Sequence, residues 1–271
     1  MINYTERLAL LMEDICRRTP RLSFIDLKEV LVFGRFGRSD AEGAFATCHC
    51  LTLPESEPGY YFWRDRDTGE LTRRSEWFVT KSPEVRVANT RIKYLISFVL
   101  PRFCDQTLQR SRKSDLYPAA APPWLAKLDT VIHELYHIDP DAAGIRKLIR
   151  ADGTDSPRSH GPLFYEEVAE MVTSYLQSRP DPELFEFLNH DFDGLTARYD
   201  GVVATTFRNF PSFPQRYMQA VEMPPSEPAI RIEPMKPPTQ PVLYTEDDLQ
   251  MRQFTDQTSR RLTRKGAHRA A

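Results

Sequence analysis

Residues 133–137 read His133-Glu134-Leu135-Tyr136-His137, which is an H-E-x-x-H pattern. Residues four positions apart lie on one face of an α-helix, so the two imidazoles can bind the same metal ion. Glu134 then stands beside that metal, where its carboxylate can take a proton from a metal-bound water. The spacing predicts a Zn²⁺ centre of hydrolytic type, with His133 and His137 as ligands and Glu134 as the catalytic base.

The residues around the motif favour a helix. Pro122-Pro123 suits a first helical turn, and Pro140 ends the run soon after His137. The alternative interpretation is a solvated helix face that carries two histidines and a glutamate. Against it stand apolar residues that recur at helical spacing and would bury the back of the site: Trp124, Leu125, Leu128, Val131, Ile132 and Leu135.

Zinc of catalytic type needs a third protein ligand and one open position. His160 is the main candidate, because it precedes a second helical pattern that runs from Phe164 to Arg179-Pro180. A glutamate of that second helix is the alternative ligand. Acidic residues that could instead accept hydrogen bonds from the ligand imidazoles are the three helix glutamates and two loop aspartates: Glu166, Glu167, Glu170, Asp141 and Asp155.

The order of these motifs resembles the SprT-like metalloproteases, the group that includes Spartan, over roughly residues 120–180. It is also similar to phage and bacterial metallopeptidases of related pattern. The resemblance implies that His133, His137 and His160 bind zinc, that Glu134 is the catalytic base, and that the fold is zincin-like α+β. A link to DNA–protein crosslinks is what the likeness to Spartan would imply. The matching residues are His133, Glu134, His137, His160, Gly161, Pro162 and Phe164.

Several other polar residues are candidates for smaller roles. Tyr136, Tyr165 and Arg146 could polarise a substrate carbonyl or could fill core between two packed helices. His49 stands between two cysteines in a strand pattern, on the opposite face from both, and lacks a partner pair for a structural metal site. His190 is expected in a surface turn.

Composition restricts the class of protein. The chain has 271 residues, of which 41% are hydrophobic, enough for a core. Its formal charge of −2 means that the chain as a whole does not attract nucleic acid electrostatically. Its four cysteines show no disulfide framework, which favours a reducing compartment. No signal peptide and no membrane-spanning apolar run are visible. We therefore expect a cytoplasmic enzyme with protein or peptide substrates and no membrane partner.

The elements that must position the motif are a first helix, a small and mostly antiparallel sheet, and the two helices already described. One strand beside the motif helix is expected to bind substrate by strand addition. We assign this role to Arg86–Ser97, with a buried central strand as the alternative for residues 94–100. A helix is predicted at 3–18. Within residues 28–36 a strand is predicted at 29–33, with Gly34 and Gly37 as breaks after it. Further strands are predicted at 45–53 and at 84–100, the latter with a turn at 88–90, and a hairpin is predicted around 67–69.

The chain is expected to divide into a zincin-like metallopeptidase domain at 1–217, a Pro-rich linker at 218–243 and a charged tail, helical or disordered, at 244–271. A basic helix is expected within 101–121, and with the basic tail it gives weak support for nucleic acid as a partner. Two rival functions remain at this point. One is a zinc-containing, nucleic-acid-associated binding protein with weak catalysis, and the other is a metal-dependent hydrolase of non-peptide substrates.

Overall fold

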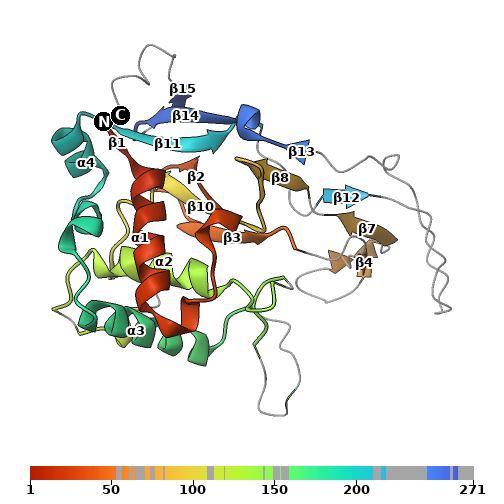
Figure 1. Ribbon diagram of the computed structural model, residues 1–271, viewed down its shortest axis with the longest axis horizontal. Coiled ribbons are helices and arrows are strands. Elements are labelled where there is room, and N and C mark those ends of the chain that lie inside the picture. Colours follow the sequence, from red (N-terminus) through yellow and green to blue (C-terminus); the bar gives the residue numbers. More distant parts are fainter. Residues whose placement is uncertain are drawn as a thin grey trace.

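The computed structural model describes residues 1–52, 57–60, 63–64, 71–73, 77–81, 83–108, 113–118, 120–142, 144–148, 153, 159–209, 215–217, 243–256 and 259–261. Helices and strands both contribute, and the architecture is α+β as expected (Figure 1). The Pro-rich segment 218–242 and the hairpin turn at 67–69 lie outside the described residues.

The α-helices are α1 (Tyr4–Arg18), α2 (Leu125–Tyr136), α3 (Pro162–Gln177) and α4 (Phe192–Tyr199). Short 3-10 helices are η1 (Pro20–Leu22), η2 (Leu27–Glu29), η4 (Ser114–Leu116), η5 (Pro182–Leu184), η6 (Glu186–Asn189) and η7 (Glu246–Asp248). The strands are β1 (Ile2–Asn3), β2 (Val30–Gly37), β3 (Ala46–Cys50), β4 (Glu57–Tyr60), β5 (Trp63–Arg64), β6 (Leu71–Arg73), β7 (Trp77–Lys81), β8 (Glu84–Val87), β9 (Thr90–Arg91), β10 (Tyr94–Pro101), β11 (Val202–Phe207), β12 (Gln215–Tyr217), β13 (Leu243–Tyr244), β14 (Leu249–Phe254) and β15 (Ser259–Arg261).

The sheet nearest α2 has the order β2-β10-β3. Strand β10 is central and wholly buried, parallel to β2 and antiparallel to β3. This sheet is therefore mixed, whereas we expected a mostly antiparallel one. The parallel pairing follows from the path of the chain. After β2 the chain forms β3 and later the β8–β9 hairpin, and it then returns as β10 beside β2 in the same direction.

Gly34 does not break its strand, contrary to the expectation. Strand β2 continues through it to Gly37, and Gly34 pairs with Phe98 of β10. A Cβ atom at Gly34 would lie 2.8 Å from the Cβ of Ala204 in β11. The glycine therefore permits a close approach between two strands rather than a turn.

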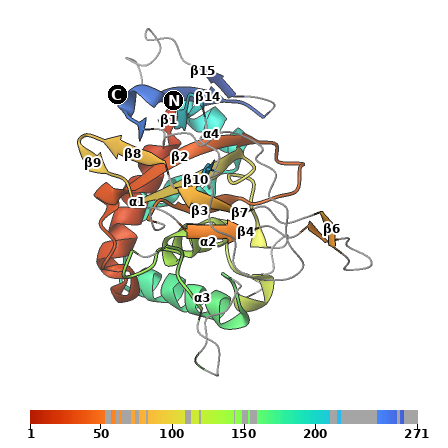
Figure 2. The ribbon, with the colours of Figure 1, turned by 90° about the vertical axis from the view of Figure 1, so that its right-hand side faces the viewer.

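A second sheet has the order β1-β11-β14-β15 and stacks on the far side of the first sheet from α2 and α3 (Figure 2). Two of its strands, β14 and β15, come from the segment 244–271, which was expected to be a helical or disordered charged tail. That expectation is wrong for these strands. Strand β14 pairs antiparallel with β11 along its length, and Phe254 at its end is only 2% exposed, within the main core. Only Phe254 of this strand is buried and its other residues are half-buried, so the sequence shows no alternating apolar pattern that would predict a strand.

The helices lie where the apolar patterns predict. Helix α1 buries Leu8, Leu11 and Ile15 against the core, and α2 packs between the β2-β10-β3 sheet and α3 (Figure 2). The basic helix expected within 101–121 is not present among the described residues of that stretch, which form turns and η4. In the part of the chain that the structure describes, no helix is long and apolar enough to cross a bilayer.

Candidate metal centre

Helix α2 carries the H-E-x-x-H motif in its last turn. Pro122 and Pro123 precede the helix and accept its first backbone hydrogen bonds, and His137 forms its C-terminal cap. Val131, Ile132 and Leu135 are fully buried on the opposite face. The helix therefore presents the two histidines from a firmly packed support, as the apolar pattern predicts.

His160 is brought to the same place by the start of α3. Gly161 is the extended N-cap residue of that helix, and Pro162 occupies its first turn, where a proline fits because no intrahelical donor is needed. Phe164 is fully buried, and its ring stacks on the His137 imidazole with centroids 4.9 Å apart. This packing holds the loop that carries His160 against α2.

The three imidazoles converge through their Nε2 atoms. His133 Nε2 lies 3.0 Å from His160 Nε2 and 3.1 Å from His137 Nε2. Among the described residues, these histidines form the group that could hold a metal ion, with one ligand atom from each residue, all within 4.8 Å of one another. The expectation that His160 joins His133 and His137 is therefore confirmed as a geometric fact.

The donor set fits zinc. Burial lowers the pKa of His133 well below its usual value and that of His137 to about 3, and burial followed by the Lys113 charge lowers that of His160. All three imidazoles are therefore neutral near pH 7, the state that binds metal. Two nitrogens held about 2.0–2.1 Å from a tetrahedral zinc ion lie about 3.3 Å apart, close to the spacings found here.

The described acidic residues that were considered as ligands, or as acceptors for the ligand imidazoles, have other partners or are exposed. Glu167 accepts a hydrogen bond of 2.6 Å from the Tyr136 hydroxyl and lies near Arg21, and Glu170 also faces Arg21. Glu166 and Asp141 are exposed and do not line the cavity described below. Asp155 lies outside the described residues. Helix periodicity alone could not decide which of these groups faces the histidines.

The ligands differ in their outer contacts. His160 Nδ1 lies 3.2 Å from the Ser159 hydroxyl, which can set the orientation of that ring. The Nδ1 atoms of His133 and His137 are buried and have no hydrogen-bond partner within the described part of the chain. A cation on the Nε2 atoms would leave the proton of each ring on Nδ1.

Glu134 is 5% exposed and lies between the helix and the edge strand. Burial raises the pKa of its carboxyl to about 7, and this effect is opposed by the Lys113 charge, by the backbone N–H of Cys48 and by Arg35. A bound cation would act in the same direction as these groups. Glu134 and Cys48 line the same cavity, so the carboxyl lies beside β3.

Strand β3 is the strand whose edge adjoins the candidate centre. It ends the sheet on the side of α2, and hydrogen bonds from Val99 to Phe45 and from Leu51 to Lys93 establish which of its residues face β10. By antiparallel alternation, the backbone groups of Ala46 and Cys48 point away from β10. The assignment of this edge to Arg86–Ser97 is wrong, because residues 94–97 belong to the central strand, paired on both sides.

The alternation expected around His49 is confirmed. Cys48 and Cys50 pack against the main core on one face of β3, whereas the next odd-numbered residue, Leu51, belongs to a second cluster. Burial lowers the pKa of His49 to about 4, with a further contribution from Arg35. His49 does not line the cavity beside the triad.

A cavity of about 710 Å³ adjoins the triad and Glu134. Tyr165 lines it, with its ring stacked 5.7 Å from that of His160. Tyr136 and Arg146 do not line it: Arg146 lies over the Tyr136 ring and donates to the Tyr136 carbonyl at 2.6 Å. Of the three candidates for polarising a carbonyl, Tyr165 alone borders this cavity.

Three polar residues of the cavity wall were not assigned to the metal centre from the sequence, although Lys113 belonged to the basic helix expected within 101–121: Gln106, Lys113 and Thr130. Thr130 could have been found, since it lies one helical turn before His133 and Glu134. Gln106 and Lys113 come from a stretch of turns with no motif, and only the tertiary fold brings them to α2.

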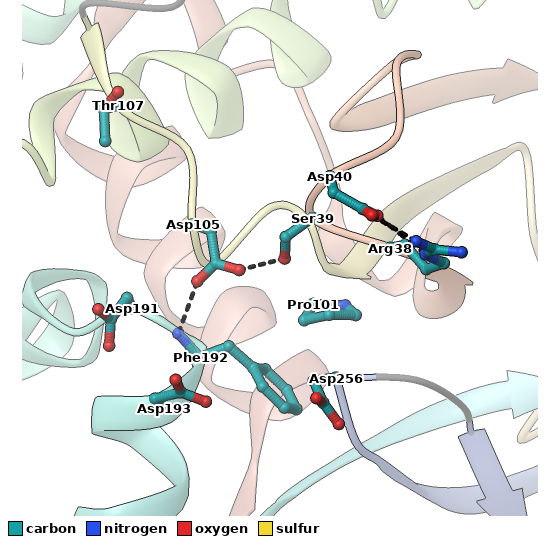
Figure 3. A pocket seen from close by; sticks show the side chains of 10 residues that line it. All are labelled: Arg38, Ser39, Asp40, Pro101, Asp105, Thr107, Asp191, Phe192, Asp193 and Asp256. Atoms are coloured by element: carbon teal, nitrogen blue, oxygen red, sulfur yellow. Dashed lines mark hydrogen bonds and ion pairs between the residues drawn. The ribbon is translucent and has the colours of Figure 1, made fainter.

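A separate cavity of about 910 Å³ is lined by several aspartates (Figure 3). Three of its five aspartates have local structural partners: Asp40 pairs with Arg38, Asp105 accepts from the backbone N–H of Phe192 and from the Ser39 hydroxyl, and Asp191 caps α4 through Gly194. Its described residues form no metal-holding group. We therefore assign it no chemistry.

Comparisons of this chain with protein-family models, with curated proteins and with solved structures find no match.

Proposed function

We propose that this protein is a zinc-dependent peptidase of the SprT-like type, which hydrolyses peptide bonds with Glu134 as general base. The observation that carries the proposal is the convergence of three histidine Nε2 atoms beside a buried glutamate, in a cavity that borders a strand edge. A site that only stabilised the fold would have no use for a carboxylate at that position.

Zinc is the metal that three neutral imidazoles with one open position favour. Held by His133, His137 and His160, it would act as a Lewis acid on the substrate carbonyl and lower the pKa of a coordinated water. The buried apolar back of α2 keeps the site rigid, and Phe164 holds the His137 ring in place.

Glu134 performs the proton transfers in this proposal. Its carboxylate accepts a proton from the water as the oxygen forms a bond to the peptide carbonyl carbon. When the C–N bond breaks, Glu134 passes that proton to the leaving amine, so the carboxylate is regenerated. Glu134 lines the cavity together with the three histidines, so its carboxylate lies beside the reacting groups in both steps.

An extended peptide is the substrate that the edge of β3 suits best. Backbone groups of Ala46 and Cys48 point toward this edge, and residues 44–48 form one wall of the cavity. A peptide that pairs with β3 as a further strand would run past the Nε2 atoms of the triad with its backbone hydrogen-bonded to β3. A deep pocket closed on all sides would instead favour a small non-peptide substrate.

Glu134→Gln tests the proposal. Glutamine has nearly the same size and shape as glutamate and leaves the three histidines in place, so we expect the variant to keep the fold and one zinc per chain while peptide cleavage falls by at least about 100-fold. The control is Glu166→Gln, the same substitution at an exposed position of α3, which is expected to cleave at the wild-type rate.

Zinc content and cleavage of unfolded protein and peptide substrates are measured together on all three proteins. A Glu134→Gln variant that holds zinc and cleaves as fast as wild type would remove Glu134 as base. Wild type that holds zinc but cleaves no peptide would favour the zinc-containing, nucleic-acid-associated binding protein instead.

A further inference from the structure

The inner wall of the cavity is polar. Gln106, Lys113 and Thr130 line it and are each less than a tenth exposed. The Thr130 hydroxyl lies 2.9 Å from Gln106 Nε2 and 3.1 Å from Lys113 Nζ, so both donate to it. Ligand-binding pockets in proteins are mostly lined by apolar side chains, and the few polar groups in their walls usually bind a polar group of the ligand.

The ammonium group of Lys113 forms an ion pair with a buried residue outside the cavity lining. Its partner is the carboxylate of Asp129, which is 1% exposed and does not line the cavity. Asp129 also accepts from the Tyr117 hydroxyl, so its negative charge is shared between two donors. A buried ion pair adds little stability because of its desolvation cost, and a role in placing the cation explains the arrangement better.

The charge of Lys113 lies beside the candidate metal centre. Lys113 lines the same cavity as His133, Glu134 and His160. Within the described lining of the cavity, Lys113 is the one lysine or arginine and Glu134 the one acidic residue. With a dication on the histidines, the cavity would carry net positive charge.

We propose that Lys113, with Gln106 and Thr130, forms a carboxylate-binding subsite beside the reaction centre and makes the enzyme select substrates with an anionic group next to the scissile bond. This inference rests on the proposed function and names its substrate class. The carboxylate is that of an aspartate or glutamate side chain or that of a free C-terminus. Thr130 lies one helical turn before His133, so the anionic group lies within about two residues of the bond that is cleaved.

The test uses the full, zinc-loaded chain and matched quenched fluorescent peptides. One set carries Glu, Gln or Leu at each of the two positions on either side of the scissile bond. The second set ends in a free carboxylate or an amide shortly after that bond. We expect kcat/KM to be at least about tenfold higher for the carboxylate at one of these places. The two sets distinguish a side-chain source from a C-terminal source.

Variants then assign the preference to Lys113. Lys113→Met with Asp129→Leu removes both charges and leaves none buried alone, and we expect the Glu:Gln ratio to fall to about one. Lys113→Arg retains the charge and should retain the preference. Lys28→Met, at an exposed lysine of η2, is the matched control and should keep the wild-type ratio.

Binding of the same peptides to zinc-loaded Glu134→Gln protein, followed by fluorescence anisotropy, separates this inference from the proposed function. If wild type cleaves none of the peptides but the Glu134→Gln protein binds the carboxylate peptides more tightly than the neutral ones, the peptidase is overturned and the subsite is supported. Cleavage with equal kcat/KM for carboxylate and neutral peptides at every position would overturn the subsite and support the peptidase. A ratio that survives in the double variant would also overturn the assignment to Lys113.

Discussion

Cys48 of the edge strand β3 and Glu134 of the motif helix α2 line the same cavity, and the backbone N–H of Cys48 lowers the pKa of the Glu134 carboxyl. These residues are far apart in the sequence, and neither helix periodicity nor strand alternation relates them. Their positions place the proposed general base between the triad and the strand edge on which a peptide would lie. In the proposed mechanism, substrate binding and proton transfer would therefore both depend on the packing of β3 against α2.

Metal binding is expected to depend on His160. Wild type, purified without chelator or a histidine tag, should contain about one zinc per chain, and His160→Ala should bind zinc at least tenfold more weakly, because two imidazoles remain of three. Metal analysis and chelator competition measure both quantities. His190→Ala is the control, since His190 lies near Glu186 and away from the triad. Full zinc retention in His160→Ala would remove this residue as a ligand.

Zinc removal is expected to destabilise the fold. A ligand that binds only the folded state at about 100 times its Kd contributes about 2.7 kcal/mol. For a chain of this size, that corresponds to a fall in Tm of about 5–10 °C on chelation. Calorimetry with and without chelator measures it. The variant His133→Ala/His137→Ala should show no response to chelator, and an equal response there would place the stabilising metal elsewhere.

Asp14 is expected to contribute stability that is lost at low pH. Burial raises the pKa of its carboxyl, but hydrogen bonds from Arg17, Arg18 and Tyr175 outweigh burial and lower it overall. Because the folded pKa lies below the unfolded value of about 3.9, the stabilisation is present above about pH 4 and disappears as the pH falls through the folded pKa.

Asp14→Asn should therefore lower the free energy of unfolding by about 1–2 kcal/mol at pH 7, and its deficit relative to wild type should shrink as the pH falls below about 4. Urea unfolding at pH 7 and pH 3 measures the difference. The exposed Asp193→Asn is expected to change it by less than about 0.5 kcal/mol. A deficit for Asp14→Asn that is constant with pH would contradict the assignment.

The close approach of the two sheets is expected to require Gly34. Its added Cβ would lie 2.8 Å from Ala204 Cβ and 3.3 Å from the Phe254 ring, so Gly34→Ala should cost about 1–3 kcal/mol of unfolding free energy. Removing the opposing methyl group in Gly34→Ala/Ala204→Gly should restore part of that loss. Urea unfolding of both proteins compares them, and a Gly34→Ala protein as stable as wild type would show that the strands can separate without cost.

Local pattern was sufficient for the helices and for two of the three histidines. His133 and His137 share a helix face because of their spacing alone, and α1, α2 and α3 follow from apolar residues at helical intervals. These features depend on neighbours within a few positions, so a single sequence contains the information needed to predict them. His160 was also identified, from a motif at a helix start rather than from geometry.

Long-range packing decided the rest. The choice of His160 over the α3 glutamates depends on the rotation of that helix, which Phe164 and the contact of Tyr136 with Glu167 establish. Strand β14 joins the second sheet through its pairing with β11 rather than through its own charged sequence. The position of β3 at the edge of the described sheet, and the contact of Lys113 with Thr130, depend on contacts between segments that no periodicity relates. The sequence by itself determined which groups could do chemistry, and the tertiary structure decided which of them meet, because burial and strand pairing act between distant parts of the chain.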